Sequence, residues 1–377
     1  MSTRLRLLHA WIAQVEALLP GQRVTRSRVW ALFALGMVWA GTVRVHQVAA
    51  ALPLGVRVPS IERRLRRFLA NPAVSVPTLW QPLLPWLLAR WAGTEVVLVF
   101  DPTPYRAEWT VLWVGIVVHR RVLPLTWQVV PQPQPWPASL AVLLPPLLAP
   151  IAAALPADCQ VTLLGDRGVA GPTLIDGAQA YGWEVVLRLN VGETQAHRLR
   201  RGEATGQGWG PEQRLWDWVA QVGSGWHGPV QIFKDAGWRT GSLTIHRRRG
   251  MKEWWILFST GPGGRARVRQ YARRARVEAI FADSKRRGWG LEQSRVRQEE
   301  HLDRLLLVWH LAVWWLHALG REVIKRGLRP RFERTDRRER SVVHLGWWWL
   351  HDVLLHDRCP PLLFHPVATG WEARGTP

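Results

Sequence analysis

Apolar and polar residues follow a helical pattern over residues 1–92. The run WALFALGMVWAG is apolar, and the segment SIERRLRRFLAN continues as a basic amphipathic stretch after Ser60. Serine is a preferred residue at helix N-termini, so Ser60 is a candidate N-cap. We therefore expect residues 1–92 to form a series of short helices.

The pattern changes to strand-like runs over residues 93–190. EVVLVFDPT predicts a strand ending in an acid, and VLWVGIVVHRRVLPLTWQVV predicts two more strands around a basic turn. After a proline-rich connector comes an apolar, proline-broken helix, then the strand CQVTLLGDRG, a helix from about Pro172, and the strand WEVVLRLN. This order is typical of a mixed sheet with helices on both faces. The ribonuclease H-like fold has it, and other α/β folds fit as well.

The second half of the chain predicts an interruption and then a return to helices. Residues 191–264 are rich in Gly, Trp and Arg with short alternating runs, which indicates a β-rich insertion. A helix is expected from about Arg265 to Lys285, followed by an apolar helix that Gly320 would end. The chain thus divides into segments 1–92, 93–190, 191–264, 265–325 and 326–377, the last being a basic tail.

One stretch raises the question of a membrane span. Residues 122–157 contain no charged residue, and the second half of this stretch is strongly apolar. Four prolines in it, Pro145, Pro146, Pro150 and Pro156, remove backbone donors that a spanning helix must satisfy internally. A buried helix broken by prolines is therefore the expectation, without a membrane.

The charge balance favours a polyanionic partner. The chain has 50 Lys and Arg against 28 Asp and Glu, a formal net charge of +22. The excess is mostly arginine, which binds phosphate through a planar fork and stacks on bases, so nucleic acid is favoured. Arg63, Arg64, Arg66 and Arg67 form the basic face of one predicted helix. That face is either a DNA contact or an ordinary solvated surface.

Several other classes of protein lack support. Two cysteines, Cys159 and Cys359, are too few for a disulfide framework and form no C-x-x-C pair, which fits a reducing cytoplasm. The first residues lack the apolar core of a secretory signal, so we expect the mature chain to begin there. The phosphate-binding, zinc-protease and serine-hydrolase motifs G-x-x-x-x-G-K-[ST], H-E-x-x-H and G-x-S-x-G are missing.

Three acids are candidates for metal chemistry. Asp101 and Asp166 each end a predicted strand, where two carboxylates can converge and bind Mg²⁺ through their oxygens. Alone, either acid is more commonly a turn residue. Glu278 lies on the predicted helix YARRARVEAIFADSK, and within roughly 60° of it, at about 100° per residue, lie Tyr271, Arg274 and Lys285. That face fits a metal ligand beside phosphate contacts, or a solvated helix with ion pairs.

The spacing Tyr, two residues, Arg, three residues, Glu, six residues, Lys resembles the Y-R-E-K signature of bacterial insertion-sequence DDE transposases, the IS-four-like group. GDRG at Asp166 and DPT at Asp101 resemble the first two acid motifs of that family, and SKRRGWGLEQSR resembles the segment after the signature. The resemblance covers about residues 60–320. Ala275 stands where the family has a bulky aromatic, and Pro102 follows the first acid, departures that concern packing more than chemistry.

The resemblance implies a fold, a chemistry and partners. The fold is an α/β, ribonuclease H-like mixed-sheet core with a β-rich insertion and a helical N-terminal DNA-binding region. Asp101, Asp166 and Glu278 would hold two Mg²⁺ ions, with Mn²⁺ as a substitute, and Asp101 would bridge both ions. Tyr271, Arg274 and Lys285 would contact phosphates at the transposon end, and Trp255, next to Trp254, would stack on a flipped base.

The reaction implied is cut-and-paste excision and integration of an insertion sequence, by hydrolysis and transesterification. The partners would be double-stranded DNA, as terminal inverted repeats and as target, and a second copy of the chain in the synaptic complex. The location would be the bacterial cytoplasm, in association with the nucleoid. The alternatives are a repurposed DNA-binding protein that no longer cuts, a metal-dependent endonuclease, and a basic membrane-associated protein.

Overall fold

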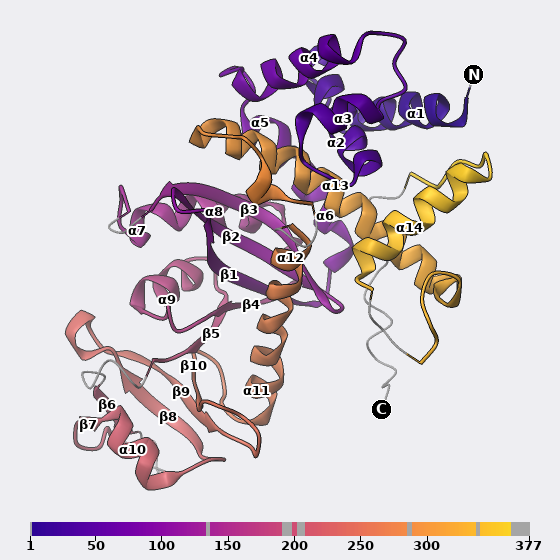
Figure 1. The fold of residues 1–377 in the computed structure, drawn as a ribbon. Helices are drawn as coiled ribbons and strands as arrows, with labels where there is room; N and C mark the ends of the chain where they lie inside the picture. The colour runs from indigo at the N-terminus through magenta and orange to yellow at the C-terminus, as the bar shows by residue number, and fades with distance from the viewer. Residues whose placement is uncertain are drawn as a thin grey trace.

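A computed structural model describes residues 2–132, 136–190, 198–201, 208–284, 289–336 and 340–362, and at Arg198 and residues 282–284 it describes the backbone alone. Within these residues, ten strands form one mixed sheet in the order β3-β2-β1-β4-β5-β10-β9-β8-β6-β7 (Figure 1). The strands are β1 Glu95–Tyr105, β2 Trp109–Val118, β3 Arg121–Pro131, β4 Gln160–Gly165, β5 Glu184–Arg188, β6 Arg198–Arg201, β7 Gln213–Arg214, β8 His227–Ile232, β9 Arg239–His246 and β10 Trp255–Ser259.

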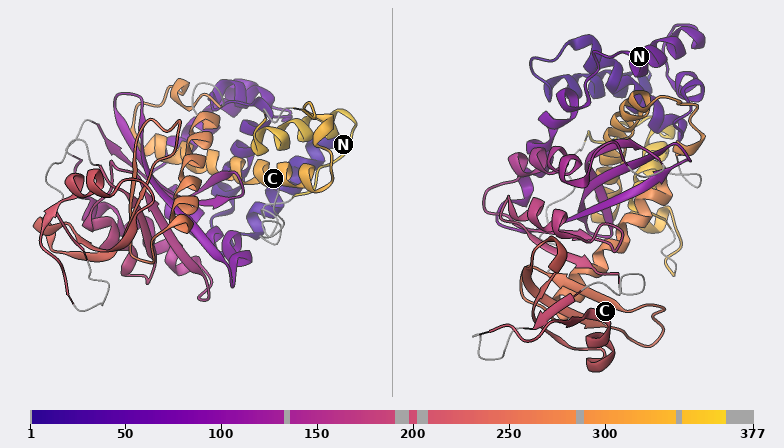
Figure 2. Two further views of the ribbon diagram at one scale, coloured as in Figure 1. Left: turned by 90° about the horizontal axis from the view of Figure 1, so that it is seen from below. Right: turned by 90° about the vertical axis from the view of Figure 1, so that its left-hand side faces the viewer.

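Helices precede, interrupt and follow the sheet. The α-helices are α1 Thr3–Ala17, α2 Val24–Ala40, α3 Val45–Ala51, α4 Val58–Ala70, α5 Val76–Trp80, α6 Leu84–Leu88, α7 Leu140–Leu143, α8 Pro145–Ala154, α9 Pro172–Gln179, α10 Leu215–Val222, α11 Arg265–Ala272, α12 Val277–Ser284, α13 Glu299–Lys325 and α14 Val342–Leu355. The N-terminal helices lie at one end of the molecule and β6–β9 at the other, with β1–β5 between them (Figure 2).

The five strands predicted for residues 93–190 are present. β1 pairs with β2 antiparallel and with β4 parallel, and β4 pairs with β5 parallel. Neighbouring residues of β3 point to opposite faces, as strand geometry requires. The Thr126 hydroxyl donates to a backbone carbonyl of α8 at 2.8 Å, whereas the Trp127 indole donates to Asp303 of α13 at 2.7 Å. Helices therefore cover both faces of this mixed α/β sheet.

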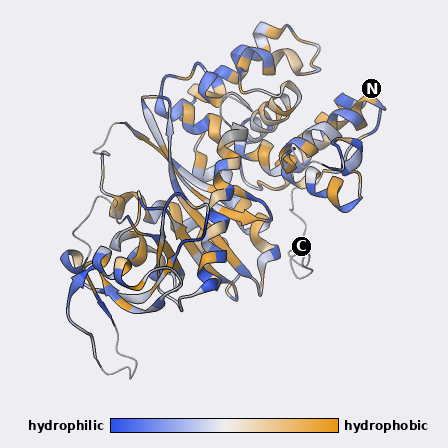
Figure 3. Ribbon diagram, turned by 60° about the horizontal axis from the view of Figure 1, so that its bottom comes forward, coloured by the Kyte–Doolittle hydropathy of each residue, from blue (hydrophilic) through white to orange (hydrophobic). Residues whose placement is uncertain are grey.

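The strands of residues 191–264 continue the same sheet. β10 pairs antiparallel with β5, and β9, β8 and β6 follow outward, also antiparallel. β1 is buried along most of its length, whereas only Val230 and Ile232 of β8 are buried. Figure 3 shows the same contrast between apolar central strands and the more hydrophilic far end of the sheet. This region also contains α10, which the sequence pattern did not predict.

The buried helix α13 ties the N-terminal helices to the sheet. Trp309, Trp314 and Trp315 of α13 are fully buried. The Trp314 indole donates to a backbone carbonyl of β3 at 2.8 Å, and Trp30 of α2 donates to a carbonyl of α13 at 3.2 Å. Several of the 26 tryptophans thus serve in the core, and the indoles of Trp30 and Trp314 find backbone acceptors there.

Three local predictions were wrong. Ser60 does not cap a helix, because α4 begins at Val58 after Arg57. The helix expected from Arg265 is divided by a 3₁₀ turn, Arg273–Arg276, between α11 and α12. Gly320 does not end its helix, because α13 continues to Lys325.

No single helix among the described residues is both long and apolar enough to cross a membrane. Only α2 and α3 taken together meet those limits of length and composition, and they are bent by 91° where they join.

Gly320 has a packing role. A Cβ at Gly320 would lie 1.8 Å from the Val342 carbonyl oxygen, and one at Gly346 would lie 2.0 Å from the Leu316 carbonyl oxygen. The backbones of α13 and α14 therefore approach each other through two glycines, and no side chain fits between them.

We predict that Gly320→Ala lowers the free energy of unfolding by about 1 to 3 kcal/mol, the usual cost of overpacking. At a helix position with open space around it, the same change would raise the free energy of unfolding by about 1 kcal/mol. The sign of the change therefore tells close packing at Gly320 from open space. Urea unfolding measures it. Gly55→Ala is the control, since a Cβ there meets nothing within 4 Å. An unchanged or raised stability in Gly320→Ala would contradict the close approach.

Candidate active site

Asp101 and Asp166 are brought together by the pairing of β1 with β4. The register places Phe100 beside Gly165, so the residue that follows each, Asp101 or Asp166, emerges at the same level of the sheet. Asp101 still belongs to β1, and Asp166 directly follows β4. The Asp101 side chain is 11% exposed and that of Asp166 is 26% exposed. Two acids 65 positions apart in the sequence thus share one partly buried spot.

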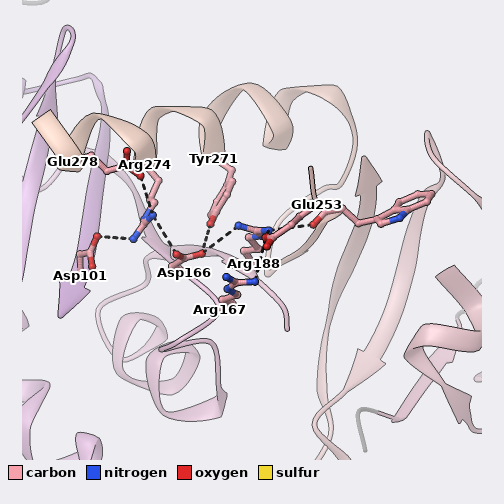
Figure 4. A network of polar contacts seen from close by, with 9 residues as sticks. Asp101, Asp166, Arg167, Arg188, Glu253, Tyr271, Arg274 and Glu278 are labelled. Carbon is pink, nitrogen blue, oxygen red and sulfur yellow. Dashed lines mark hydrogen bonds and ion pairs between the residues drawn. The ribbon is translucent and has the colours of Figure 1, made fainter. Parts of the chain in front are cut away.

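The segment from α11 to α12 passes over that spot. Tyr271 lies near the end of α11, Arg274 lies in the 3₁₀ turn, and Glu278 lies in the first turn of α12. Figure 4 shows Arg274 reaching from the helix to the space between Asp101 and Asp166, with Tyr271 beside it. The three signature residues therefore face the two acids, although the helix itself is divided.

One guanidinium contacts all three candidate acids. Arg274 donates from Nη2 to Asp101 Oδ2 at 2.7 Å, and its Nη1 lies 3.2 Å from Asp166 Oδ2. The same Nη1 lies 3.9 Å from Glu278 Oε1, a looser contact. The Arg274 side chain is only 18% exposed, whereas that of Glu278 is 74% exposed. Two short charge-assisted contacts to buried acids thus dominate the position of Arg274.

Tyr271 completes the environment of Asp166. Its hydroxyl donates to Asp166 Oδ1 at 2.9 Å, and its ring packs edge-to-face on Trp255 with centroids 5.2 Å apart. Trp255 begins β10 and is half-buried. The tryptophan chosen from the sequence therefore lies beside the signature tyrosine.

Three residues next to this site were missed from the sequence. Arg188 ends β5, and its Nη1 lies 4.0 Å from Asp166 Oδ1. Glu253 accepts from Arg188 and, at 3.1 Å, from Arg167. Arg188 could have been found by the argument used for Asp166, since Gly165 and Leu187 pair in neighbouring parallel strands and these two residues come directly after them. Glu253 lies just before β10 and has no such signal.

The acids titrate differently. Burial raises the pKa of Asp101 to about 6, and this effect, with the negative charges of Asp166 and Glu278, outweighs the attraction of Arg274. Burial also acts to raise the pKa of Asp166, but Arg274, a backbone N–H and the Tyr271 hydroxyl together hold that pKa below its usual range. Burial, with the charge of Asp166, raises the pKa of Tyr271, which keeps its proton and remains a donor.

The acids are not arranged as ligands around one point. Among the described residues, no group of three His, Cys, Asp or Glu side chains is close enough to hold one metal ion. The cation at the centre of the set is the Arg274 guanidinium. The donors are carboxylate oxygens, which hard divalent cations prefer, so the chemistry of the set fits Mg²⁺ once Arg274 withdraws.

The other predicted DNA contacts lie elsewhere. Arg63, Arg64, Arg66 and Arg67 are exposed on α4, away from the acids. Arg66 pairs with Glu62 at 2.6 Å, and Arg64 lines a separate hollow against α1 and α2. Arg63, Arg66 and Arg67 line one hollow on α4, and only Arg64 lies apart from them. Lys285 lies outside the described residues.

Comparison with known proteins gives the class of this domain. Residues 139–315, slightly under half of the chain, match the family described as transposase DDE domain. This span includes Asp166 and the segment from Tyr271 to Glu278, and Asp101 precedes it. The prediction of a DDE-type DNA transposase enzyme is therefore confirmed at the level of class. DDE transposases use divalent metal ions.

A solved structure gives a more distant likeness. The chain is similar to the cryo-EM structure of the piggyBac transposase synaptic complex with hairpin DNA, with a TM-score of 0.41 and 8% sequence identity. The likeness covers 98% of this chain and 86% of that one. No curated protein matches the sequence. The class therefore rests on the domain match.

We predict that Asp101 makes stability depend on pH. The folded chain keeps the Asp101 proton up to a pKa of about 6, whereas the unfolded chain releases it near 3.8, so between these values the folded state binds more protons. The stability that Asp101 contributes is therefore present at low pH and lost as pH rises through about 6. Without metal, Asp101→Asn should gain stability relative to wild type over that window, by up to about 3 kcal/mol.

Urea unfolding of both proteins at the two ends of this pH window measures the difference. A constant difference between Asp101→Asn and wild type would contradict the raised pKa. Asp235→Asn is a matched control, since it removes a carboxylate from an exposed turn between β8 and β9.

Proposed function

We propose that this chain catalyses cut-and-paste transposition of an insertion sequence, cleaving DNA at the ends of the element and joining those ends to a target. The observation that carries the proposal is the contact of one guanidinium with Asp101, Asp166 and Glu278. It brings all three predicted acids to one place beside a cation. The strand order β3-β2-β1-β4-β5, with β4 parallel and β2 antiparallel to β1, supports a ribonuclease H-like core.

The same acids would hold the catalytic metal. Asp101, Asp166 and Glu278, which all contact Arg274, would hold two Mg²⁺ or Mn²⁺ ions through their carboxylate oxygens. When bound, the ions supply charge stabilisation to the attacking and leaving oxygens of phosphoryl transfer. Asp101, with a pKa of about 6, and Asp166, with a lowered pKa, are mostly ionised at neutral pH.

Arg274 is the residue that would exchange partners. Its guanidinium supplies positive charge to the buried carboxylate of Asp101 and the half-buried one of Asp166. A divalent ion at those carboxylates would displace it, and the displaced guanidinium would be available for a DNA phosphate beside the site. Tyr271 holds Asp166 in place throughout, since its hydroxyl donates to the oxygen Oδ1, whereas Arg274 contacts the oxygen Oδ2.

Duplex DNA is the proposed partner, as terminal inverted repeats and as target, in a complex with a second copy of the chain. The net charge of +22 supports a polyanionic partner. Trp255 would take a flipped base after separating from Tyr271. The bacterial cytoplasm, near the nucleoid, is the proposed location.

A second candidate is a metal-dependent endonuclease with the same acids. An endonuclease and a transposase would use these three acids in the same way for cleavage. The two functions differ only in whether the cut DNA ends are held for joining. The presence of all three acids around Arg274 favours either enzyme over a repurposed DNA-binding protein.

Glu278→Gln should retain DNA binding but lose both cleavage and joining by at least about a hundredfold, because a neutral amide replaces an exposed metal-ligand carboxylate. The assay uses labelled duplexes from either side of the reading frame, in Mg²⁺ and in chelator, and scores cleavage and joining separately. Glu300→Gln, at an exposed position in the first turn of α13, is the control. Full activity in Glu278→Gln would exclude this triad, and cleavage without joining in wild type would favour the endonuclease.

Arg274→Gln should bind Mn²⁺ about ten- to hundredfold more tightly than wild type, because the metal no longer competes with charge-assisted hydrogen bonds from Arg274. Titration calorimetry without DNA measures this. Arg188→Gln is the matched control, because Arg188 reaches Asp166 only at 4.0 Å and contacts neither other acid closely. Equal or weaker Mn²⁺ binding by Arg274→Gln would contradict the exchange.

A further inference from the structure

A second basic feature lies between the N-terminal helices and the core. A cavity of about 730 Å³ is lined by the α2–α3 turn, by α3 and α4, and by residues 293–305. Arg44, Arg66, Arg295 and Arg297 line it, together with His46 and His301. None of the described residues that line this cavity is acidic. We name it the basic cleft.

The arginines of the basic cleft come from segments far apart in the sequence. Arg44 precedes α3, Arg66 belongs to α4, and Arg295 and Arg297 lie in the loop before α13. Arg44, Arg295 and Arg297 are exposed, and neither Arg295 nor Arg297 forms an ion pair with another residue that the structure describes. Bringing these like charges into one hollow is unfavourable unless a polyanion occupies it.

The basic cleft is fixed relative to the acids. Tyr105 ends β1, the strand of Asp101, and its hydroxyl contacts the Ser294 hydroxyl at 2.7 Å and the Leu291 carbonyl. The next residue, Arg106, donates to the carbonyls of Ser294 and Val296. Four residues of strand, about 13 Å, separate Tyr105 from Asp101. The loop that carries Arg295 and Arg297 is therefore attached to the same strand as the first acid.

The N-terminal wall of the cleft is attached to the same loop. The Val43 backbone N–H donates to the Trp289 carbonyl at 3.0 Å, and Arg44 donates to the Gln293 side chain. Both walls of the cleft thus meet at residues 289–296. The two walls of the basic cleft are therefore held in position relative to each other before any partner binds.

We propose that the basic cleft binds the sugar-phosphate backbone of the DNA duplex whose strand is cut at Asp101, Asp166 and Glu278. Tyr105, which anchors the loop of the cleft, lies about 13 Å along β1 from Asp101, a length that about four base pairs span at about 3.4 Å each. This proposal rests on the proposed function, because it concerns the same DNA duplex and says where that duplex lies beyond the three acids. Arg44, Arg295 and Arg297 contact phosphates and set the position of the duplex without reading its sequence.

The test measures the salt dependence of duplex binding, using a 30-base-pair DNA of random sequence. The triple variant Arg44→Gln, Arg295→Gln and Arg297→Gln should reduce the slope of log affinity against log salt by about three, because each arginine that neutralises a phosphate contributes about one to that slope. The affinity at low salt should fall at least about tenfold. An unchanged slope in this variant would overturn the proposal.

A matched control removes the same charge elsewhere. Arg326, Arg331 and Arg334 pair with Glu322, Asp352 and Asp336 at 2.6, 2.9 and 2.9 Å in the C-terminal region. Their triple change to Gln should leave the slope near that of wild type. An equal reduction in both triple variants would attribute the effect to net charge and would overturn the proposal, and circular dichroism checks that each variant is folded.

Two further outcomes separate this proposal from the function it rests on. Glu278→Gln should bind the duplex with the wild-type slope, because Glu278 is outside the basic cleft. A wild-type chain that does not bind duplex DNA would overturn the proposed function as well as the cleft. Cleft-dependent binding of polyglutamate, without cleft-dependent binding of the duplex, would assign the surface to an acidic protein and overturn only the cleft.

Discussion

The site depends on the parallel register of β1 and β4. Because Phe100 pairs with Gly165, Asp101 and Asp166 emerge side by side, and every other contact of the site follows from that position. Gly165 is part of the constraint, since a Cβ there would lie 2.6 Å from Leu174 and 2.9 Å from Leu187. The tight packing of α9 and β5 against β4 therefore requires glycine directly before the second acid. A shift of one residue in this register would turn one acid into the opposite face.

Two acids held side by side in a partly buried place need positive charge, and Arg274 supplies it. Burial nevertheless raises the pKa of Asp101 to about 6, whereas Arg274, Tyr271 and a backbone N–H favour the charged form of Asp166 and lower its pKa. Arg274 also links the site to the proposed substrate, because a metal ion would compete with Arg274 for the carboxylates and a DNA phosphate would compete with the carboxylates for Arg274. Tyr105 extends the arrangement to the basic cleft, because the strand that presents Asp101 also anchors the loop before α13.

Much of this arrangement could be predicted from residue patterns, and the failures have physical causes. The strands ending at Asp101 and Asp166 were predicted because β-branched runs that stop at an acid are local signals. Helical spacing predicted that Tyr271, Arg274 and Glu278 lie on one face. Spacing within a helix does not show which residues of other elements that face contacts, so the contact of Arg274 with Asp101 was missed. Gly320 was taken as a helix end because the packing of α14 against it is a tertiary effect. The basic cleft combines Arg44, Arg295 and Arg297, which only the fold brings together.

The central claim is that Asp101, Asp166 and Glu278 form one cation site. Fe²⁺ in place of Mg²⁺, with ascorbate and peroxide, generates hydroxyl radicals at the bound ion, and these cut the nearby backbone. We expect chain breaks near residues 101, 166 and 278 together, all suppressed by excess Mg²⁺ and all lost in Asp101→Asn. Breaks near only one of these residues, or breaks that persist in Asp101→Asn, would contradict a shared site.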